Sequence, residues 1–217
     1  MTENELIEEF NILFEDLATA GSKGLDNYEK SICYTYAQEQ IVKQLAIQGQ
    51  LTHIRDLVKI DTSLVGTFTA SKYKTGKNIA IPPTLLQEIA YFATDTDRDI
   101  TGALVPQQVI DTMLSMPYHY PPKHLVYVVV GEDTNIVFFP LNFTPVSFST
   151  RYVEYPTPVI LEALTGDDSI NELTALTLPI LNDAYLKDLV TAAVQYAITI
   201  YIGQPEKEVP NGNTRNK

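Results

Sequence analysis

The spacing of apolar residues at the start of the chain predicts an amphipathic helix. Apolar side chains recur at intervals of three and four from Leu6 to Leu17, which places them on one helical face. Thr2 and Glu5 form a capping-box pattern just ahead of this run. Gly21 and Gly24 then supply a turn that ends the helix.

A second helix is expected from about residue 27 to residue 48. Asp26 and Glu29 repeat the capping-box pattern at its start, and Gly49 interrupts it. A shorter helix is expected over 51–59. The residues expected to face inward from the long helix are Tyr28, Ile32, Cys33, Tyr36, Ile41, Val42 and Leu45.

After Asp61 the pattern changes to one typical of strands. Thr, Val, Phe and Tyr become frequent, Pro punctuates the chain, and residues 131–134 form the turn of a predicted β-hairpin. A short helix is expected after Pro106, with Val109, Ile110, Met113 and Leu114 on its apolar face, ending at Pro117. The expected strands cover residues 64–72, 79–81, 87–93, 124–130, 135–140 and 148–155.

The last predicted element is a helix capped by Asn182 or Asp183 and ending before Gly203. Its Ala-rich apolar face is expected to pack on the two N-terminal helices. The predicted fold is therefore α+β, a helical bundle of N-terminal helices and C-terminal helix with an inserted β-rich domain. The expected parts are residues 1–60 and 181–203 for the bundle, 61–180 for the β-rich domain, and 204–217 for a flexible tail.

Charge restricts the possible partners of the chain. With 15 basic and 27 acidic residues the net charge is −12, so tight binding to nucleic acid phosphates is not expected. No apolar run is long enough to cross a bilayer, and the acidic N-terminus does not resemble a signal peptide. The single cysteine, Cys33, lies in an apolar helical pattern and is expected to be a small buried residue.

Candidate chemistry is sparse. The run Asp95–Asp99 resembles the start of a calcium loop, but Ile100 and Pro106 occupy the positions that require Gly and Glu, so a solvated turn is favoured. His119 and His124 lie close in sequence without enough further ligands for zinc. No phosphate loop, nucleophile elbow or metalloprotease pattern is present. We therefore expect no cofactor, no metal and no enzymatic activity.

Three stretches near the N-terminus carry a family resemblance. The runs are EFNILF from Glu9, GLDNYEKS from Gly24 and YAQEQIVK from Tyr36. They resemble the N-terminus of virion structural proteins of crAss-like phages of gut Bacteroidales. Fainter matches are Ile79–Pro82, Pro121–Pro122, Tyr152–Leu161 and Leu178–Ala197.

This resemblance implies a structural ring subunit of the head–tail connector or tail, stacked below the portal. It implies a homo-oligomeric ring, expected to be a dodecamer, of adaptor or stopper type, with portal and neighbouring tail ring proteins as partners. The genomic DNA would pass through the lumen without tight binding, and the acidic balance agrees with such a lumen. The expected location is the virion, assembled in the cytoplasm of the bacterial host.

The tail after residue 203 is the predicted docking segment for a neighbouring ring, because many assembly proteins order such tails on binding. The docking candidates are Pro205, Glu206, Val209, Pro210 and Arg215. An alternative function is a distal-tail module that binds a host surface glycan through the tyrosines of the β-rich domain. The chain has 13 Tyr and no Trp, and aromatic faces with a polar tip suit exposed interfaces.

Overall fold

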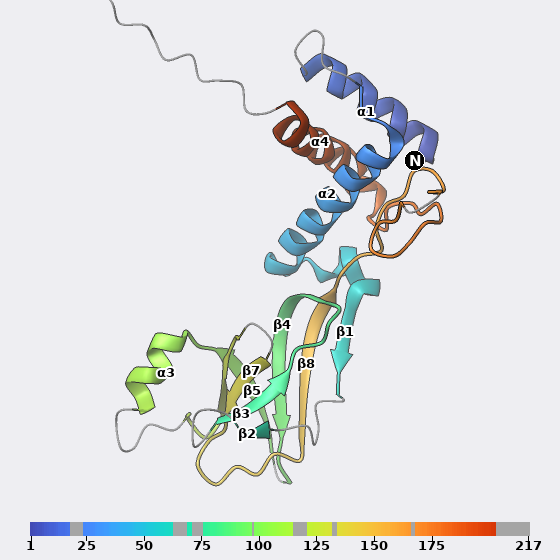
Figure 1. Ribbon diagram of the computed structural model, residues 1–217. Coiled ribbons are helices and arrows are strands. Elements are labelled where there is room, and N and C mark those ends of the chain that lie inside the picture. Colours follow the sequence, from blue (N-terminus) through green and yellow to red (C-terminus); the bar gives the residue numbers. More distant parts are fainter. Residues whose placement is uncertain are drawn as a thin grey trace, which may run out of the picture. The chain divides into compact units, whose positions relative to one another are not determined.

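The computed structural model describes residues 1–17, 24–62, 69–70, 76–96, 98–114, 121–131, 134–165 and 168–202. The chain divides into two compact units, one formed by residues 1–41 with 156–217 and the other by residues 42–155. We call them the helical unit and the sheet unit. The fold is mixed α+β, as predicted (Figure 1). None of the described helices is long and apolar enough to cross a bilayer.

The helical unit begins with α1 (Glu3–Leu17) and α2 (Asn27–Ile47), which continues past the division at residue 41. Both predicted capping boxes are confirmed. The amide of Thr2 donates to Glu5 Oε2 at 2.7 Å and the amide of Glu5 donates to Thr2 Oγ1 at 3.4 Å. At α2 the amide of Asp26 donates to Glu29 Oε2 at 3.0 Å and that of Glu29 to Asp26 Oδ1 at 2.8 Å.

The C-terminal helical region forms in three pieces. A 3₁₀ turn η2 (Asp183–Tyr185) leads into α4 (Leu186–Ala197), and a π-helical turn η3 (Ile198–Ile202) follows. Asn182 is the cap, since its side chain accepts the amide of Ala184. α4 contacts α1, and the ring of Tyr196 on α4 stacks on that of Tyr36 on α2. The apolar residues of α4 that are buried are Leu186, Leu189, Val190, Ala193, Val194 and Ala197.

The described residues of the sheet unit form one eight-stranded sheet in the order β1-β8-β4-β5-β6-β7-β3-β2. Its strands are β1 (Val58–Asp61), β2 (Thr69–Ala70), β3 (Gly76–Ala80), β4 (Leu85–Thr94), β5 (Asp99–Leu104), β6 (Leu125–Val129), β7 (Thr134–Phe138) and β8 (Ser147–Glu154). All neighbouring pairs are antiparallel except β5 and β6, which are parallel and joined through α3 (Gln107–Leu114).

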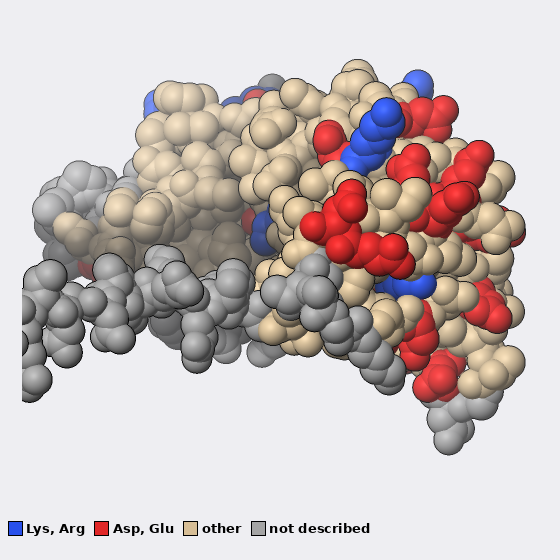
Figure 2. Space-filling view, turned by 90° about the horizontal axis from the view of Figure 1, so that it is seen from above, with Lys and Arg blue, Asp and Glu red and all other residues tan. Residues whose placement is uncertain are grey.

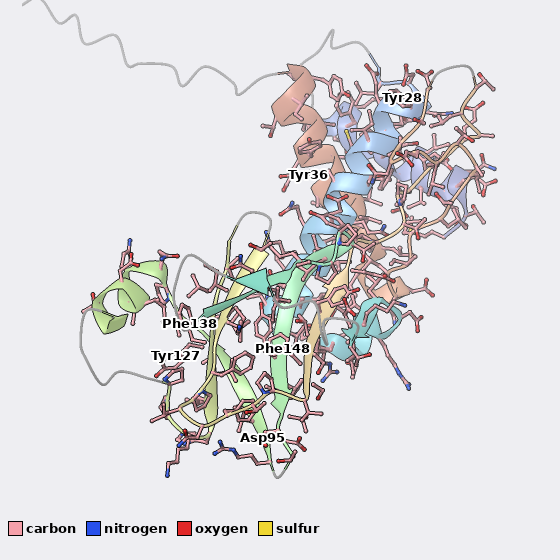
Figure 3. All side chains as sticks on the ribbon, turned by 60° about the horizontal axis from the view of Figure 1, so that its bottom comes forward. Tyr28, Tyr36, Asp95, Tyr127, Phe138 and Phe148 are labelled. Carbon is pink, nitrogen blue, oxygen red and sulfur yellow. The ribbon has the colours of Figure 1, made fainter. Side chains whose placement is uncertain are left out.

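The sheet curls so that its inner face encloses the core. Asn135 on β7 donates to Glu88 Oε1 on β4 at 2.7 Å, although β5 and β6 separate these two strands in the sheet. The ring of Phe148 on β8 lies 6.0 Å from that of Tyr91 on β4 (Figure 3 labels Phe148). The buried inner cluster consists of Ile79, Tyr91, Ala93, Ile100, Val126, Val128, Val137, Phe143 and Phe148.

The outer face of β6 and β7 is covered by α3. Ile110 of this helix packs with Val129 and Phe138, whose neighbours Val128 and Val137 point to the inner cluster. The alternation of inward and outward apolar residues along these strands follows from the two-residue period of a strand. Both the hairpin of β6 with β7 and the short helix after Pro106 are therefore confirmed.

Two strands differ from the sequence prediction. The helix expected over 51–59 is a 3₁₀ helix, η1 (Leu51–Leu57), and Val58 already starts β1, which pairs antiparallel with β8. β5 was not predicted, because it contains Gly102 and few apolar residues. Gly102 is required there, since a Cβ at this position would lie 2.5 Å from Tyr91 Cβ on β4. Of the strand predicted over 64–72, residues 64–68 and 71–72 lie outside the described residues, while Thr69–Ala70 form β2.

The boundary between the units also differs from the predicted one. Residues 156–180, expected in the β-rich domain, group with the helical unit. The described residues of this range, 156–165 and 168–180, contain two isolated bridges and no strand of the sheet.

Candidate functional site

Three polar side chains of α2 are buried along one side of the helix. Ser31, Thr35 and Gln38 follow at intervals of four and three, which puts them on the same face. Ser31 and Gln38 are fully buried and Thr35 nearly so. We call these three residues the polar stripe.

The polar stripe binds the main chain of the extended segment that follows β8. Gln38 Nε2 donates to the carbonyl of Thr157 at 2.8 Å. Thr35 Oγ1 donates to the carbonyl of Val159 at 3.2 Å and accepts its amide at 3.0 Å. Ser31 Oγ accepts the amide of Leu161 at 3.0 Å. These bonds supply partners for backbone groups that have no neighbouring strand, which is what allows the segment to be buried.

The same stripe fixes a second extended stretch, residues 173–182, which we call the arm. Gln38 Oε1 accepts the amide of Ile180 at 2.9 Å. Thr177 exchanges two backbone hydrogen bonds with Ile160, at 2.9 and 3.0 Å, and its hydroxyl donates to the carbonyl of Pro158. The arm is thus anchored on its inner side while Leu173, Leu176, Leu178 and Ile180 remain exposed.

Aromatic residues hold the helices of this unit together. Tyr34 on α2 is fully buried, its ring lies 5.6 Å from that of Phe10 on α1, and its hydroxyl donates to the carbonyl of Leu6 at 2.8 Å. Burial raises the pKa of Tyr34 far above its usual value. Tyr36, expected to face inward, is 40% exposed, with its ring 3.9 Å from that of Tyr196 (Tyr36 is labelled in Figure 3).

An apolar hollow of about 340 Å³ lies in the sheet unit, where the parallel strands β5 and β6 end and α3 begins. We call it the β5–β6 groove. Among the described residues that line it, none is charged and Gln107 alone has a polar side chain. The lining residues are Leu104, Val105, Pro106, Gln107, Val129 and Val130.

In the acidic run that resembled a calcium loop, the described residues Asp95, Thr96 and Arg98 bind one another. Asp95 Oδ2 lies 3.6 Å from Arg98 Nε, and Thr96 Oγ1 donates to Asp95 Oδ1 at 2.9 Å. The guanidinium of Arg98 also lies 5.2 Å from the ring centroid of Phe143 and donates to the carbonyl of Lys123. Within the described ranges, no three His, Cys, Asp or Glu residues are grouped so as to hold a metal.

The predicted docking residues Pro205, Glu206, Val209, Pro210 and Arg215 lie outside the described residues. Sequence reasoning did not find the polar stripe, the arm or the β5–β6 groove. The alternation of Leu176, Leu178 and Ile180 in a run without charge was a signal for the arm. The groove had no such signal, because it depends on the parallel pairing of β5 with β6.

Charge is divided unequally between the two units. The helical unit contains 17 of the 27 acidic and 6 of the 15 basic residues, a net charge of −11, and the remaining 10 and 9 give the sheet unit −1. α1 alone has six acidic residues and no basic one. Figure 2 shows a face on which acidic side chains gather with only a few basic ones among them.

The matches to known proteins extend over almost the entire chain. The family described as phage tail ring protein 3/4 matches residues 1–208. The chain is 27% identical to "Ring protein 4/5" of Bacteroides phage crAss001, over 98% of each chain. It is 24% identical to "Ring protein 3" of the same phage, over 91% of this chain and 95% of the relative. The resemblance to virion structural proteins of crAss-like phages is thereby confirmed, and the chain belongs to the phage tail ring protein 3/4 family.

Proposed function

We propose that this protein is the repeating subunit of a closed ring in the head–tail connector or tail of a crAss-like phage. The observation that carries the proposal is the match over 98% of the chain and 98% of a relative named as a ring protein. The proposed role is structural, without catalysis.

The negative charge of the helical unit supports the proposal that DNA passes through the ring. A lumen that gripped phosphates through Lys and Arg would slow the genome, because each contact must be broken as the DNA moves. A wall with a net negative charge avoids such contacts. The six acidic residues of α1 and the −11 charge of the helical unit supply a surface of this sign.

The proposal also covers the copy number, the position and the contacts of the ring. The ring contains twelve copies, lies below the portal as an adaptor or stopper, and contacts the portal and neighbouring tail ring proteins. It docks on the next ring through Pro205, Glu206, Val209, Pro210 and Arg215. The helices of the helical unit form the bundle, and the sheet unit is the inserted β-rich domain.

The glycan-binding alternative requires exposed aromatic rings in the β-rich domain, since sugars stack on aromatic faces. Tyr91 and Tyr152 are buried and Tyr127 is half-buried. Among the described tyrosines of the sheet unit, Tyr155 alone is exposed. The ring proposal is therefore favoured over a glycan-binding module.

The proposal is tested by assembling the full-length protein with the portal and tail ring proteins of its phage. Negative-stain electron microscopy and native mass spectrometry should show closed rings whose mass is a fixed multiple of 24.2 kDa. Removal of residues 204–217 should leave the ring intact but abolish its attachment to the adjacent ring. A protein that stays monomeric with all these partners would contradict the proposal.

A further inference from the structure

The arm presents a regular row of apolar side chains to solvent. Leu176, Leu178 and Ile180 are 44%, 41% and 43% exposed, and they alternate with Thr177 and Pro179. In an extended chain, alternate side chains share a face. Residues 173–182 contain no charged residue in a protein of net charge −12. Such a row is unusual on a free surface and typical of a binding surface.

This row is held in place before any partner arrives. The backbone of the arm is bound along its length by hydrogen bonds. The pairs are Leu173 with Ile170, Thr174 with Leu164, Thr177 with Ile160, and Ile180 with Gln38. Because Gln38 is fully buried on α2, the arm is fixed to a helix and not only to another loop. A surface ordered in advance pays less conformational entropy on binding.

The β5–β6 groove has the complementary properties. Its described lining residues are apolar except for Gln107 and carry no charge, and Leu104 and Val130 at its edge are 54% and 55% exposed. Small-molecule sites of this size usually contain several converging polar groups that orient the ligand. A groove whose described lining offers a single polar side chain instead suits apolar side chains such as leucine and isoleucine.

The net charges of the two units decide whether the arm of one copy meets the arm or the groove of another copy. If two arms met each other, two helical units of charge −11 would be brought together. If an arm met the groove of another copy, a unit of −11 would face a unit of −1. Juxtaposed like charges are costly, so the second arrangement is favoured. A contact between two different surfaces of the same chain is heterologous, which is the type that closes into a ring.

We infer that the arm of one copy docks in the β5–β6 groove of the next copy, with Leu176, Leu178 and Ile180 as the inserted side chains. The partner is therefore a second copy of this chain, in head-to-tail orientation. This inference rests on the proposed ring function, because it names the contact between adjacent subunits.

Cysteine cross-linking tests the contact directly. Cys33 is fully buried, and burial together with Glu29 raises the pKa of its thiol to about 12, so it does not compete with introduced cysteines. The double variant Leu178→Cys/Leu104→Cys, assembled with the neighbouring ring proteins and treated with a short bismaleimide linker, should give a ladder of multimers on a denaturing gel. Each single variant should give monomers only.

In a matched control, the second cysteine is placed at an exposed leucine of the sheet unit outside the groove instead of at Leu104. Leu141 is 58% exposed and does not line the groove. The variant Leu178→Cys/Leu141→Cys should give no ladder. A ladder from this control, or dimers from Leu178→Cys alone, would overturn the head-to-tail contact.

Electron microscopy of the same samples separates this inference from the ring proposal. Rings without a ladder from Leu178→Cys/Leu104→Cys would overturn the arm–groove contact and leave the ring function standing. Absence of both rings and ladder would overturn both. As a second variant, Leu176→Ser/Leu178→Ser should abolish rings with unchanged thermal stability. The control pair Leu17→Ser/Ile47→Ser, at 57% and 67% exposure and outside the arm, should leave rings intact.

Discussion

The two units of this protein bury their extended segments by different means. In the sheet unit, strands pair with strands, and the buried inner cluster is apolar except for the Tyr91 hydroxyl. In the helical unit, residues 157–161 and the arm have few strand partners. Their backbone groups are bound instead by Ser31, Thr35 and Gln38 on α2.

The difference shows what holds the exposed apolar row of the arm in position. A purely apolar core would leave the backbone of such a segment without partners, which is costly when it is buried. Side-chain hydrogen bonds from a helix solve this problem without a strand on the outer side. The arm can therefore be rigid and still leave its outer face open to a partner.

The largest expected effect is in the sheet unit. Phe148→Ala removes a ring that is 1% exposed and packs against Tyr91 and Phe139. It should lower the free energy of unfolding by about 4 kcal/mol, from lost burial and the cavity left behind. Denaturant titration measures the loss, and hydrogen exchange should quicken in β4 to β8. Phe92 faces outward and is 40% exposed, so Phe92→Ala should lower the free energy of unfolding far less. An equal loss in both variants would contradict the assignment of Phe148 to the buried inner cluster.

Gln38→Ala should produce the next largest effect, and in the other unit. It leaves the carbonyl of Thr157 and the amide of Ile180 without partners, at a cost of about 3 kcal/mol. Hydrogen exchange should quicken in residues 156–182, while the strands of the sheet keep their protection. Gln44→Ala, at an exposed position of the same helix, is the control and should change neither. Faster exchange in the sheet alone would refute the role given to the polar stripe.

Thr35→Val tests the polar stripe without changing side-chain volume. The hydroxyl donates to and accepts from Val159, and both bonds are lost. The expected loss of stability is about 2 kcal/mol, measured by denaturant titration. Thr191→Val on the exposed side of α4 should stay within about 0.5 kcal/mol. If both variants cost the same, the buried bonds of Thr35 contribute nothing specific.

The prediction with the smallest expected effect concerns the reactivity of Cys33, which serves as a natural probe of the helical unit. Because its pKa is raised to about 12 and it is buried, a thiol reagent at pH 8 should not label the native protein. Labelling should become rapid in Gln38→Ala, in which the segment over α2 opens, and stay slow in Gln44→Ala. Immediate labelling of the unaltered protein would show that this unit is not closed.

The elements that could be predicted are those with a local pattern. The capping boxes of α1 and α2, the hairpin of β6 and β7 and the helix after Pro106 each follow from nearby residues. β1 could not be predicted, because the four residues Val58–Asp61 become a strand only by pairing with β8. β5 depends likewise on its neighbours, with Gly102 fitted against Tyr91.

The same reasoning explains why the candidate surfaces were missed. Hydrophobic periodicity assigned Tyr36 to the inner face of α2 and passed over Ser31, Thr35 and Gln38. Those polar residues are buried only because a distant segment needs their hydrogen bonds. The groove is likewise made by segments far apart in the sequence, so no local pattern could identify it. The arm did have a local signal in the alternation of Leu176, Leu178 and Ile180, but its attachment to α2 depends on the distant residue Gln38.

The ring function is tested most directly by a cryo-electron microscopy map of the virion neck and tail. We predict that this chain forms a closed, rotationally symmetric ring around the genome channel, with the acidic helical unit contributing to the lumen. In that map the arm of each copy would lie in the β5–β6 groove of its neighbour. A map that places single copies away from the channel, or at the tip of the tail, would contradict the ring function.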